Sequence, residues 1–154
     1  MQRRSRNKHV RLVEFIFRNE IEIWEAVEKE RSIGTGKMGG ASSGHVHISD
    51  PTANEAIRNV GELRCVFIRN GVKIDWPERW LRIIDAVRDW CEPNVLKREI
   101  LRRRYSGESW VKTCADIKVS PDKHLSESKY HRVVGQICTF AVQCAAQMQV
   151  IKIF

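Results

Sequence analysis

The fold is decided by the stretch Tyr105-Ser106-Gly107-Glu108-Ser109-Trp110-Val111-Lys112-Thr113-Cys114-Ala115-Asp116-Ile117-Lys118-Val119-Ser120, which is followed shortly by Ser126-Glu127-Ser128-Lys129-Tyr130-His131-Arg132. Ser106-Gly107 predicts the end of a helix, because glycine adopts the backbone angles that terminate helices and serine competes for helical hydrogen bonds. Ser109 and Ser126 are both of a residue type that caps a new helix. The stretch therefore predicts a short helix and a longer helix joined by a turn.

The first of these two helices is expected to bury one side. Its apolar positions recur at offsets that place them on a single stripe. They are Trp110, Val111, Cys114 and Ile117. Pro121 then lacks an amide hydrogen and disfavours helical angles at Ser120 before it. A turn is therefore expected between Lys118 and Leu125.

The helix that follows Ser126 is predicted to have two faces of different character. Apolar residues recur every three or four positions on the face that we expect to be buried, namely Tyr130, Val134, Ile137, Ala141, Cys144 and Met148. The opposite face is polar and mildly basic, and carries Ser128, Lys129, Arg132, Gly135, Gln136 and Thr139. Arginine pairs with guanine edges, glutamine with adenine, and serine or threonine with either, whereas glycine permits a close approach of the DNA backbone.

This pattern has a structural and a functional interpretation. An amphipathic helix that only packs on a bundle is the commoner case. A helix-turn-helix with its second helix in the DNA major groove is favoured here by the order of caps, turns and basic residues. On that interpretation the base-reading residues are Ser128, Lys129, Arg132 and Gln136. The phosphate-contacting residues are Arg102, Arg103, Arg104, Lys112, Lys118, Ser120, Lys123 and Ser126.

The region from about Val95 to Ala145 resembles the C-terminal DNA-binding region of sigma factors. It resembles still more the RinA and ArpU type of phage late-gene transcriptional regulators, which are small helical proteins that end in a sigma-like helix-turn-helix. The resemblance is carried by Arg104-Tyr105, by Trp110 to Ser120, by Ser126 to Arg132, and upstream by Ile48-Ser49-Asp50-Pro51-Thr52-Ala53. The interposed segment Pro121 to Leu125 departs from the pattern, and we expect it to form either a longer turn or an extra helical turn.

The resemblance implies a function as well as a fold. It implies a sequence-specific DNA-binding transcriptional regulator of phage or prophage origin, more specifically an activator of late gene expression, that acts at the nucleoid of the bacterial host. Double-stranded DNA is the expected partner, and host RNA polymerase is a second one. Two alternatives stay open: a small terminase-type DNA-packaging subunit that acts as a ring, and an RNA polymerase interaction module that does not read DNA.

The charge distribution agrees with a polyanionic partner. The chain has 154 residues and a formal net charge of +8. Residues 93–154 hold 11 Lys and Arg against 5 Asp and Glu, whereas residues 1–92 hold 16 against 14. The excess therefore lies in the predicted DNA-binding domain, where phosphates would require it. A solvated basic face without a function would produce the same bias.

The remainder of the chain predicts an all-α protein, and no strand is expected. Residues 1–92 are assigned to a helical N-terminal region and residues 93–154 to the helix-turn-helix domain. The N-terminal region comprises a basic arm at 1–8, one long helix from about Lys8 to Arg31, a Gly/Ser-rich linker at 32–49, and helices at about 50–70 and 75–92. The long helix is interpreted as a core helix, with a homodimer seam or a polymerase contact as alternatives. A further helix is expected from about Asn94 to Tyr105, with Val95, Leu96, Ile100 and Leu101 buried.

Several classes of protein are disfavoured by the sequence. No apolar stretch has membrane length and no signal-peptide pattern is present, so we expect a cytoplasmic protein. The five cysteines are scattered over apolar positions and are expected to be reduced core residues. No spacing predicts a metal site or a cofactor, and no nucleophile lies beside a base. We therefore expect a protein that is not an enzyme.

Overall fold

The computed structural model describes residues 2–33 and 61–152, with side chains described from Lys8 onward. The described residues are mostly helical, as expected, with two small hairpins. They divide into two compact units: unit 1 is Met1–Glu20 with Arg79–Phe154, and unit 2 is Ile21–Glu78. The boundary expected after residue 92 falls inside unit 1. Residues 34–60 lie outside the described residues. They include most of the expected Gly-rich linker and the first part of the helix expected at 50–70.

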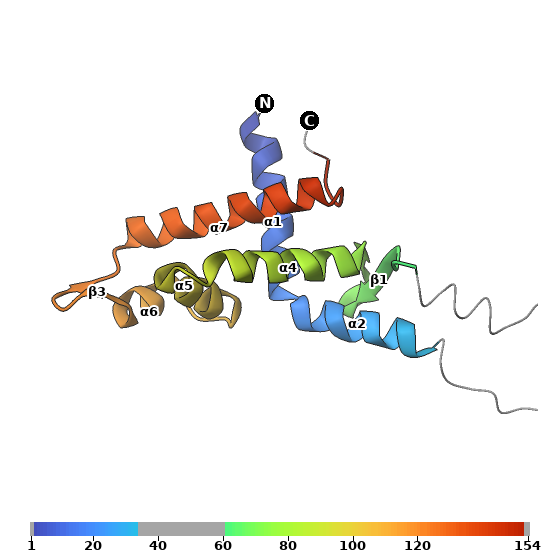
Figure 1. Cartoon of the computed structure of the whole chain (residues 1–154), viewed down its shortest axis with the longest axis horizontal. Coiled ribbons are helices and arrows are strands. Elements are labelled where there is room, and N and C mark those ends of the chain that lie inside the picture. The colour runs from blue at the N-terminus through green and yellow to red at the C-terminus, as the bar shows by residue number, and fades with distance from the viewer. Residues whose placement is uncertain (1, 34–60, 153–154) are drawn as a thin grey trace, which may run out of the picture. The chain divides into compact units, whose positions relative to one another are not determined.

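Unit 1 is built around one long helix. Its elements are α1 (Gln2–Arg18), α4 (Pro77–Cys91) from Arg79 onward, α5 (Val95–Tyr105), α6 (Trp110–Asp116), β3 (Lys118–Ser120), β4 (Lys123–His124) and α7 (Glu127–Gln147). Helices α1, α5 and α6 each pack on α7. Figure 1 shows α7 with α5 and α6 gathered near its N-terminal end, where the β3–β4 hairpin begins.

The core of unit 1 confirms most of the predicted apolar stripe of α7. Tyr130, Val134, Ile137 and Ala141 are buried, and Cys144 and Met148 are partly covered. The facing helices contribute the buried residues Val13, Ile16, Phe17, Trp80, Ile83, Ile84, Val87, Cys91, Ile100 and Leu101. In α5, however, Val95 is 63% exposed although it was expected to be buried. It is the first residue of the helix, so it lies at the end of the packed stripe.

The single N-terminal helix expected from Lys8 to Arg31 is wrong. Helix α1 ends at Arg18 and a separate helix, α2 (Glu20–Ile33), begins after Asn19. At the break, the Asn19 backbone amide donates to the Phe15 carbonyl at 3.1 Å and to the Ile16 carbonyl at 3.2 Å, and the Asn19 side-chain amide also donates to the Phe15 carbonyl, at 2.7 Å. The residues expected to form a basic arm are also helical, because α1 begins at Gln2.

Unit 2 corrects the expectations of an uninterrupted helix at 50–70 and of a protein without strands. Residues 65–75 form a hairpin of β1 (Cys65–Ile68) and β2 (Val72–Asp75), with Ile68 paired to Val72. Asn70 and Gly71, at the turn, have φ angles of 66° and 72°. Both residue types tolerate this left-handed region, which makes Asn-Gly a hairpin turn as readily as a helix end.

The entry to α4 lies where the sequence predicts it, after Asp75-Trp76-Pro77. Trp76 has a φ angle of 53°, which is unusual for a bulky residue, and its amide donates to the Arg64 carbonyl at 2.8 Å. The Glu78 carboxylate then accepts hydrogen bonds from the Arg31 guanidinium and from the Leu63 amide, the latter at 3.0 Å. Within unit 2, Glu78 thus joins α2 and the segment that leads into β1 to the start of α4.

Candidate nucleic-acid interface

The helix starts predicted around this interface are confirmed. The Ser109 hydroxyl accepts a hydrogen bond from the Lys112 amide and the Ser126 hydroxyl accepts one from the Lys129 amide, both at 3.3 Å. Each serine is the N-cap of its helix. Gly107, with a φ angle of 90°, follows the end of α5 as expected for a left-handed helix terminus. The local sequence therefore sets where α5 ends and where α6 and α7 begin.

The buried side of α6 differs from the predicted stripe. Trp110 and Val111 are 39% and 58% exposed, whereas Thr113 and Cys114 are buried. The buried Thr113 hydroxyl has a hydrogen-bond partner, because its single proton can be donated to the Ser109 carbonyl at 3.0 Å or to the Glu108 carboxylate at 3.2 Å. Helix α6 has only seven residues, so its first turn lies at the edge of the packed region.

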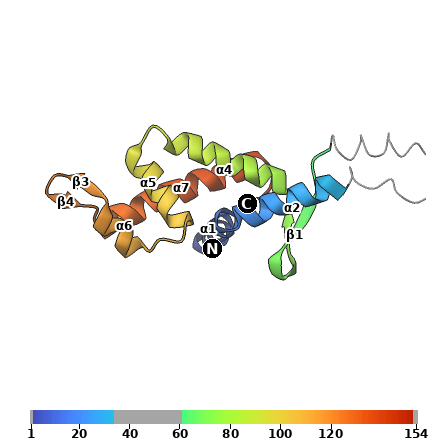
Figure 2. The same ribbon diagram turned by 90° about the horizontal axis from the view of Figure 1, so that it is seen from below.

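The segment between α6 and α7 is a β-hairpin. It agrees with the expectation of a longer turn, whereas the alternative of an extra helical turn is wrong. Lys118 pairs with His124 and Ser120 with Lys123, and the Leu125 amide donates to the Ile117 carbonyl at 2.9 Å. Every residue from 118 to 124 is exposed. Figures 1 and 2 show the hairpin projecting beyond the ends of α6 and α7. It therefore contributes surface rather than core to unit 1.

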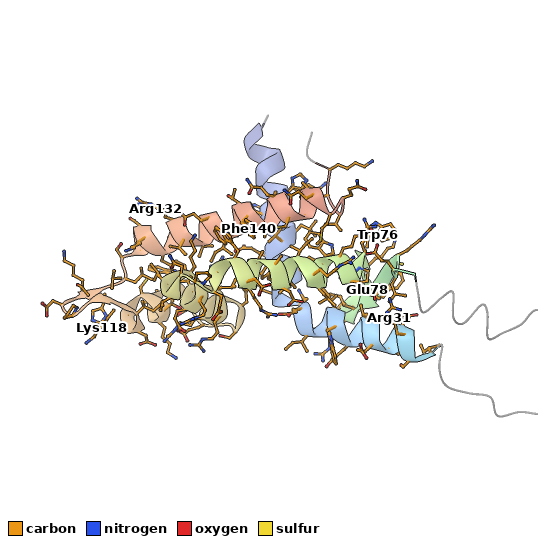
Figure 3. The ribbon with its side chains drawn as sticks, in the orientation of Figure 1. Arg31, Trp76, Glu78, Lys118, Arg132 and Phe140 are labelled. Carbon is orange, nitrogen blue, oxygen red and sulfur yellow. The ribbon has the colours of Figure 1, made fainter. Side chains whose placement is uncertain are left out.

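The predicted base-reading residues lie on exposed surface of α7. Ser128, Lys129, Arg132 and Gln136 are all exposed, as is Gly135 between the last two. Figure 3 shows Arg132 near the N-terminal end of α7 and Lys118 on the hairpin that precedes this helix. The interface thus brings together one polar helix face and an adjoining hairpin.

Two of the predicted phosphate-contacting arginines are engaged in ion pairs within unit 1. The Arg103 guanidinium lies 2.8 Å from Glu108, 3.0 Å from Asp116 and 3.4 Å from Glu99. Its side chain is only 20% exposed. Arg103 therefore fastens α5 to the loop before α6 and to the end of α6. The hydrogen bond from Arg103 in turn lowers the pKa of Glu108 below its ordinary value.

Arg104 is engaged in a different way. Its guanidinium pairs with the Glu14 carboxylate of α1 and donates to the Tyr130 hydroxyl of α7 at 3.1 Å. The side chains of Arg104 and Glu14 are 21% and 22% exposed. Arg104 of α5 therefore links α1 to α7 through its contacts with Glu14 and Tyr130. Arg102 differs from both, since it is 63% exposed; among the described residues its ion-pair partner is Glu99 of the same helix, at 3.0 Å.

The remaining predicted cations are available to an external anion. In the part of the chain that the structure describes, no carboxylate forms an ion pair with Lys118, Lys123, Lys129 or Arg132. Lys112 lies 3.9 Å from Glu108, a distance at which an exposed pair contributes little. Ser120 and Ser126 are exposed beside these cations. His124 also lies on the hairpin, and sequence reasoning missed it because only the strand pairing places it beside Lys118.

Within the ranges 2–33 and 61–152, no group of three or more His, Cys, Asp or Glu is placed to hold a metal ion. All five cysteines have free thiols, and burial raises the pKa of Cys138 to about 11. No described helix has the length and apolar character required to span a membrane. His45 and His47, the two closely spaced histidines of the Gly/Ser-rich linker, lie outside the described part of the chain.

Comparisons with known proteins provide no relative. No family model matches the chain, and no match was found among curated proteins or among solved structures. The likeness of Val95 to Ala145 to sigma factors and phage regulators therefore stays an interpretation of the residues quoted above.

Proposed function

We propose that this chain is a sequence-specific DNA-binding regulator of transcription that uses α6, the β3–β4 hairpin and α7 as an elongated helix-turn-helix. The N-terminal half of α7 enters the major groove, where Arg132 and Gln136 contact base edges together with Ser128 and Lys129. Lys112, Lys118 and Lys123 bind phosphates beside it, with Arg102, Ser120 and Ser126 as further contacts. Arg103 and Arg104 leave this set, because they are shielded as well as paired with carboxylates, whereas Arg102 is paired but mostly exposed.

The observation that carries the proposal is the division of the basic residues into two classes. Arg103 and Arg104 are shielded and paired, whereas Lys118, Lys123, Lys129 and Arg132 are exposed and lack a carboxylate partner among the described residues. Exposed cations without a carboxylate partner are available to neutralise the charge of a polyanion. Duplex DNA supplies regularly spaced phosphates and, beside them, the base edges that arginine and glutamine recognise.

The resemblance described above makes the proposal more specific. It favours a phage or prophage regulator that activates late genes in the bacterial cytoplasm, with host RNA polymerase as a second partner. The decisive experiment is selection of bound sequences from a pool of random DNA duplexes. A recurring sequence motif is expected. Recovery without a motif, or no retention of DNA at physiological salt, would contradict sequence-specific binding.

The first prediction compares two variants at the proposed interface. Arg132→Ala should weaken binding to the selected duplex by about 1–3 kcal/mol and relax the preference at one base pair, because a bidentate base contact is lost. Lys112→Ala should weaken binding to all duplexes alike and lower the slope of log K against log salt by about 1. Fluorescence anisotropy with matched and scrambled duplexes measures both effects. Unchanged binding of Arg132→Ala to every duplex would refute the proposed reading face.

A further inference from the structure

A groove runs beside the proposed base-reading face of α7. Its volume is about 600 Å³. Trp90 of α4 and Lys97 of α5 form one wall, and α7 forms the other. The lining residues are Trp90, Lys97, Arg132, Gly135, Gln136, Thr139, Phe140 and Gln143. Figure 3 shows two of them, Arg132 and Phe140, on successive parts of α7. The groove thus shares Arg132 and Gln136 with the proposed base-reading set.

The chemistry of the lining favours an anionic occupant. Lys97 and Arg132 are cationic, the glutamines and Thr139 offer hydrogen-bond donors, and no carboxylate is among the lining residues. A Cβ atom placed at Gly135 would meet nothing within 4 Å, so the groove is open beside this residue. An extended, negatively charged backbone has room to lie there.

Lys97 is held in position by aromatic side chains. Its Nζ atom lies 3.8 Å from the centroid of the Trp90 ring. The other support for this ring is Phe140, which stacks on Trp90 with centroids 4.4 Å apart and an interplanar angle of 12°. Among the described residues, no carboxylate forms an ion pair with Lys97. The ammonium group is therefore fixed at the groove wall, and part of the entropy cost of ordering a lysine is already met.

We propose that this groove holds the sugar–phosphate backbone of the DNA strand that flanks the bases contacted by α7, with Lys97 as a phosphate contact. The inference rests on the proposed function, because Arg132 and Gln136 line both the groove and the reading face. A ligand that contacts these two residues occupies the groove and the reading face together, so the two surfaces cannot bind different ligands at the same time. The Trp90–Phe140 stack is accordingly a positioning element that holds Lys97 at the edge of the interface.

Phosphate-ethylation interference on the selected duplex tests this proposal. We expect Lys97→Gln to weaken binding about three- to tenfold at 0.1 M salt, to lower the salt slope by about 1, and to abolish interference at one phosphate. Lys97→Arg retains the cation and should restore both affinity and interference. Gly135→Glu places a carboxylate in the open groove and should weaken binding without loss of thermal stability. Lys29→Gln, which removes an exposed lysine of α2, is the matched control and should bind as the wild type does.

The outcomes separate this proposal from the proposed function. If the wild type binds no duplex, both proposals fail. If the wild type and Arg132→Ala differ as expected but Lys97→Gln retains the full ethylation pattern, the groove does not hold the DNA backbone. If Lys97→Gln loses binding to RNA polymerase while its ethylation pattern stays intact, the groove belongs to an acidic protein surface, and the DNA assignment is overturned.

Discussion

Adjacent arginines of α5 have different physical roles. Arg102 is mostly exposed, whereas Arg103 and Arg104 are four-fifths buried and pair with carboxylates from other segments. A shielded arginine without such a partner is unfavourable, so we expect loss of either pair to destabilise the unit. A run of basic residues in a sequence therefore does not by itself identify a phosphate-binding surface.

The Arg103 cluster predicts a dependence of stability on pH. The hydrogen bond from Arg103 lowers the folded-state pKa of Glu108, so this contribution is complete above the ordinary glutamate pKa and is lost as the pH falls below it. Glu108→Gln lacks this ionisation. The difference in melting temperature between wild type and Glu108→Gln should therefore be largest near pH 7 and shrink towards about pH 3. A difference that stayed constant over this range would contradict the assignment. Glu28→Gln, in an exposed part of α2, serves as control.

Among the elements of the interface, the starts of α6 and α7 are fixed by serine caps within the same helix. The position of the hairpin is instead fixed by the packed residues at its base. Ser109 and Ser126 each satisfy an amide of the helix that they begin. The β3–β4 hairpin has no buried residue, and it closes through the bond from the Leu125 amide to the Ile117 carbonyl. The residues at the base of the hairpin, Leu125 and the half-buried Ile117, pack in the core, whereas both strands are exposed to solvent.

The hairpin can therefore be removed with little loss of stability. Replacement of residues 118–124 by Asn-Gly leaves Ile117 and Leu125 as the pair that flanks a two-residue turn. We expect the free energy of unfolding to change by no more than about 1 kcal/mol, because no buried side chain is lost. The salt slope of DNA binding should fall by about 2, since Lys118 and Lys123 are gone. The variant Lys118→Gln/Lys123→Gln retains the hairpin and should show the same slope. Wild-type salt dependence in both proteins would exclude the hairpin from the interface.

At the scale of the whole molecule, contacts distant in sequence assemble each unit. In unit 1, Glu14 of α1 reaches Arg104 of α5, and Phe17 of α1 packs on Tyr105 with ring centroids 5.0 Å apart. In unit 2, Glu78 receives Arg31 and the Leu63 amide. Both carboxylates are only 22% exposed. Each unit therefore depends on a shielded carboxylate that joins separate segments of the chain.

The role of Glu78 gives a prediction at this scale. Glu78→Ala should lower the free energy of unfolding by about 2 kcal/mol, because it leaves the Arg31 guanidinium and the Leu63 amide without their shared acceptor. Hydrogen exchange of the β1 and β2 amides should become faster. Affinity for the selected duplex should stay unchanged, since Glu78 lies outside the proposed interface. Glu28→Ala, at an exposed position of α2, is the control. Exchange rates equal to those of wild type would show that Glu78 does not hold the hairpin.

Helix ends and apolar stripes could be predicted from the sequence alone, because they depend on residues close together in the chain. The caps Ser109 and Ser126, the end of α5 near Gly107, the start of α4 at Pro77 and most of the buried stripe of α7 follow from neighbouring residues and helical periodicity. The polar face with Arg132 and Gln136 is exposed as expected. Its function in DNA recognition stays a prediction, because exposure is necessary for base reading but is not sufficient.

Packing between distant segments sets which cations are paired and where the chain departs from helix. Arg104 is paired because Glu14, distant in sequence, is brought beside it, and no local pattern contains that information. The short apolar run before Asn70-Gly71 fits a helix or a strand, and its pairing with β2 resolves the ambiguity. The groove at Lys97 likewise exists only because α4, α5 and α7 converge on the Trp90–Phe140 stack. Interactions between distant segments depend on the packed fold, whereas caps and periodicity act within a few residues.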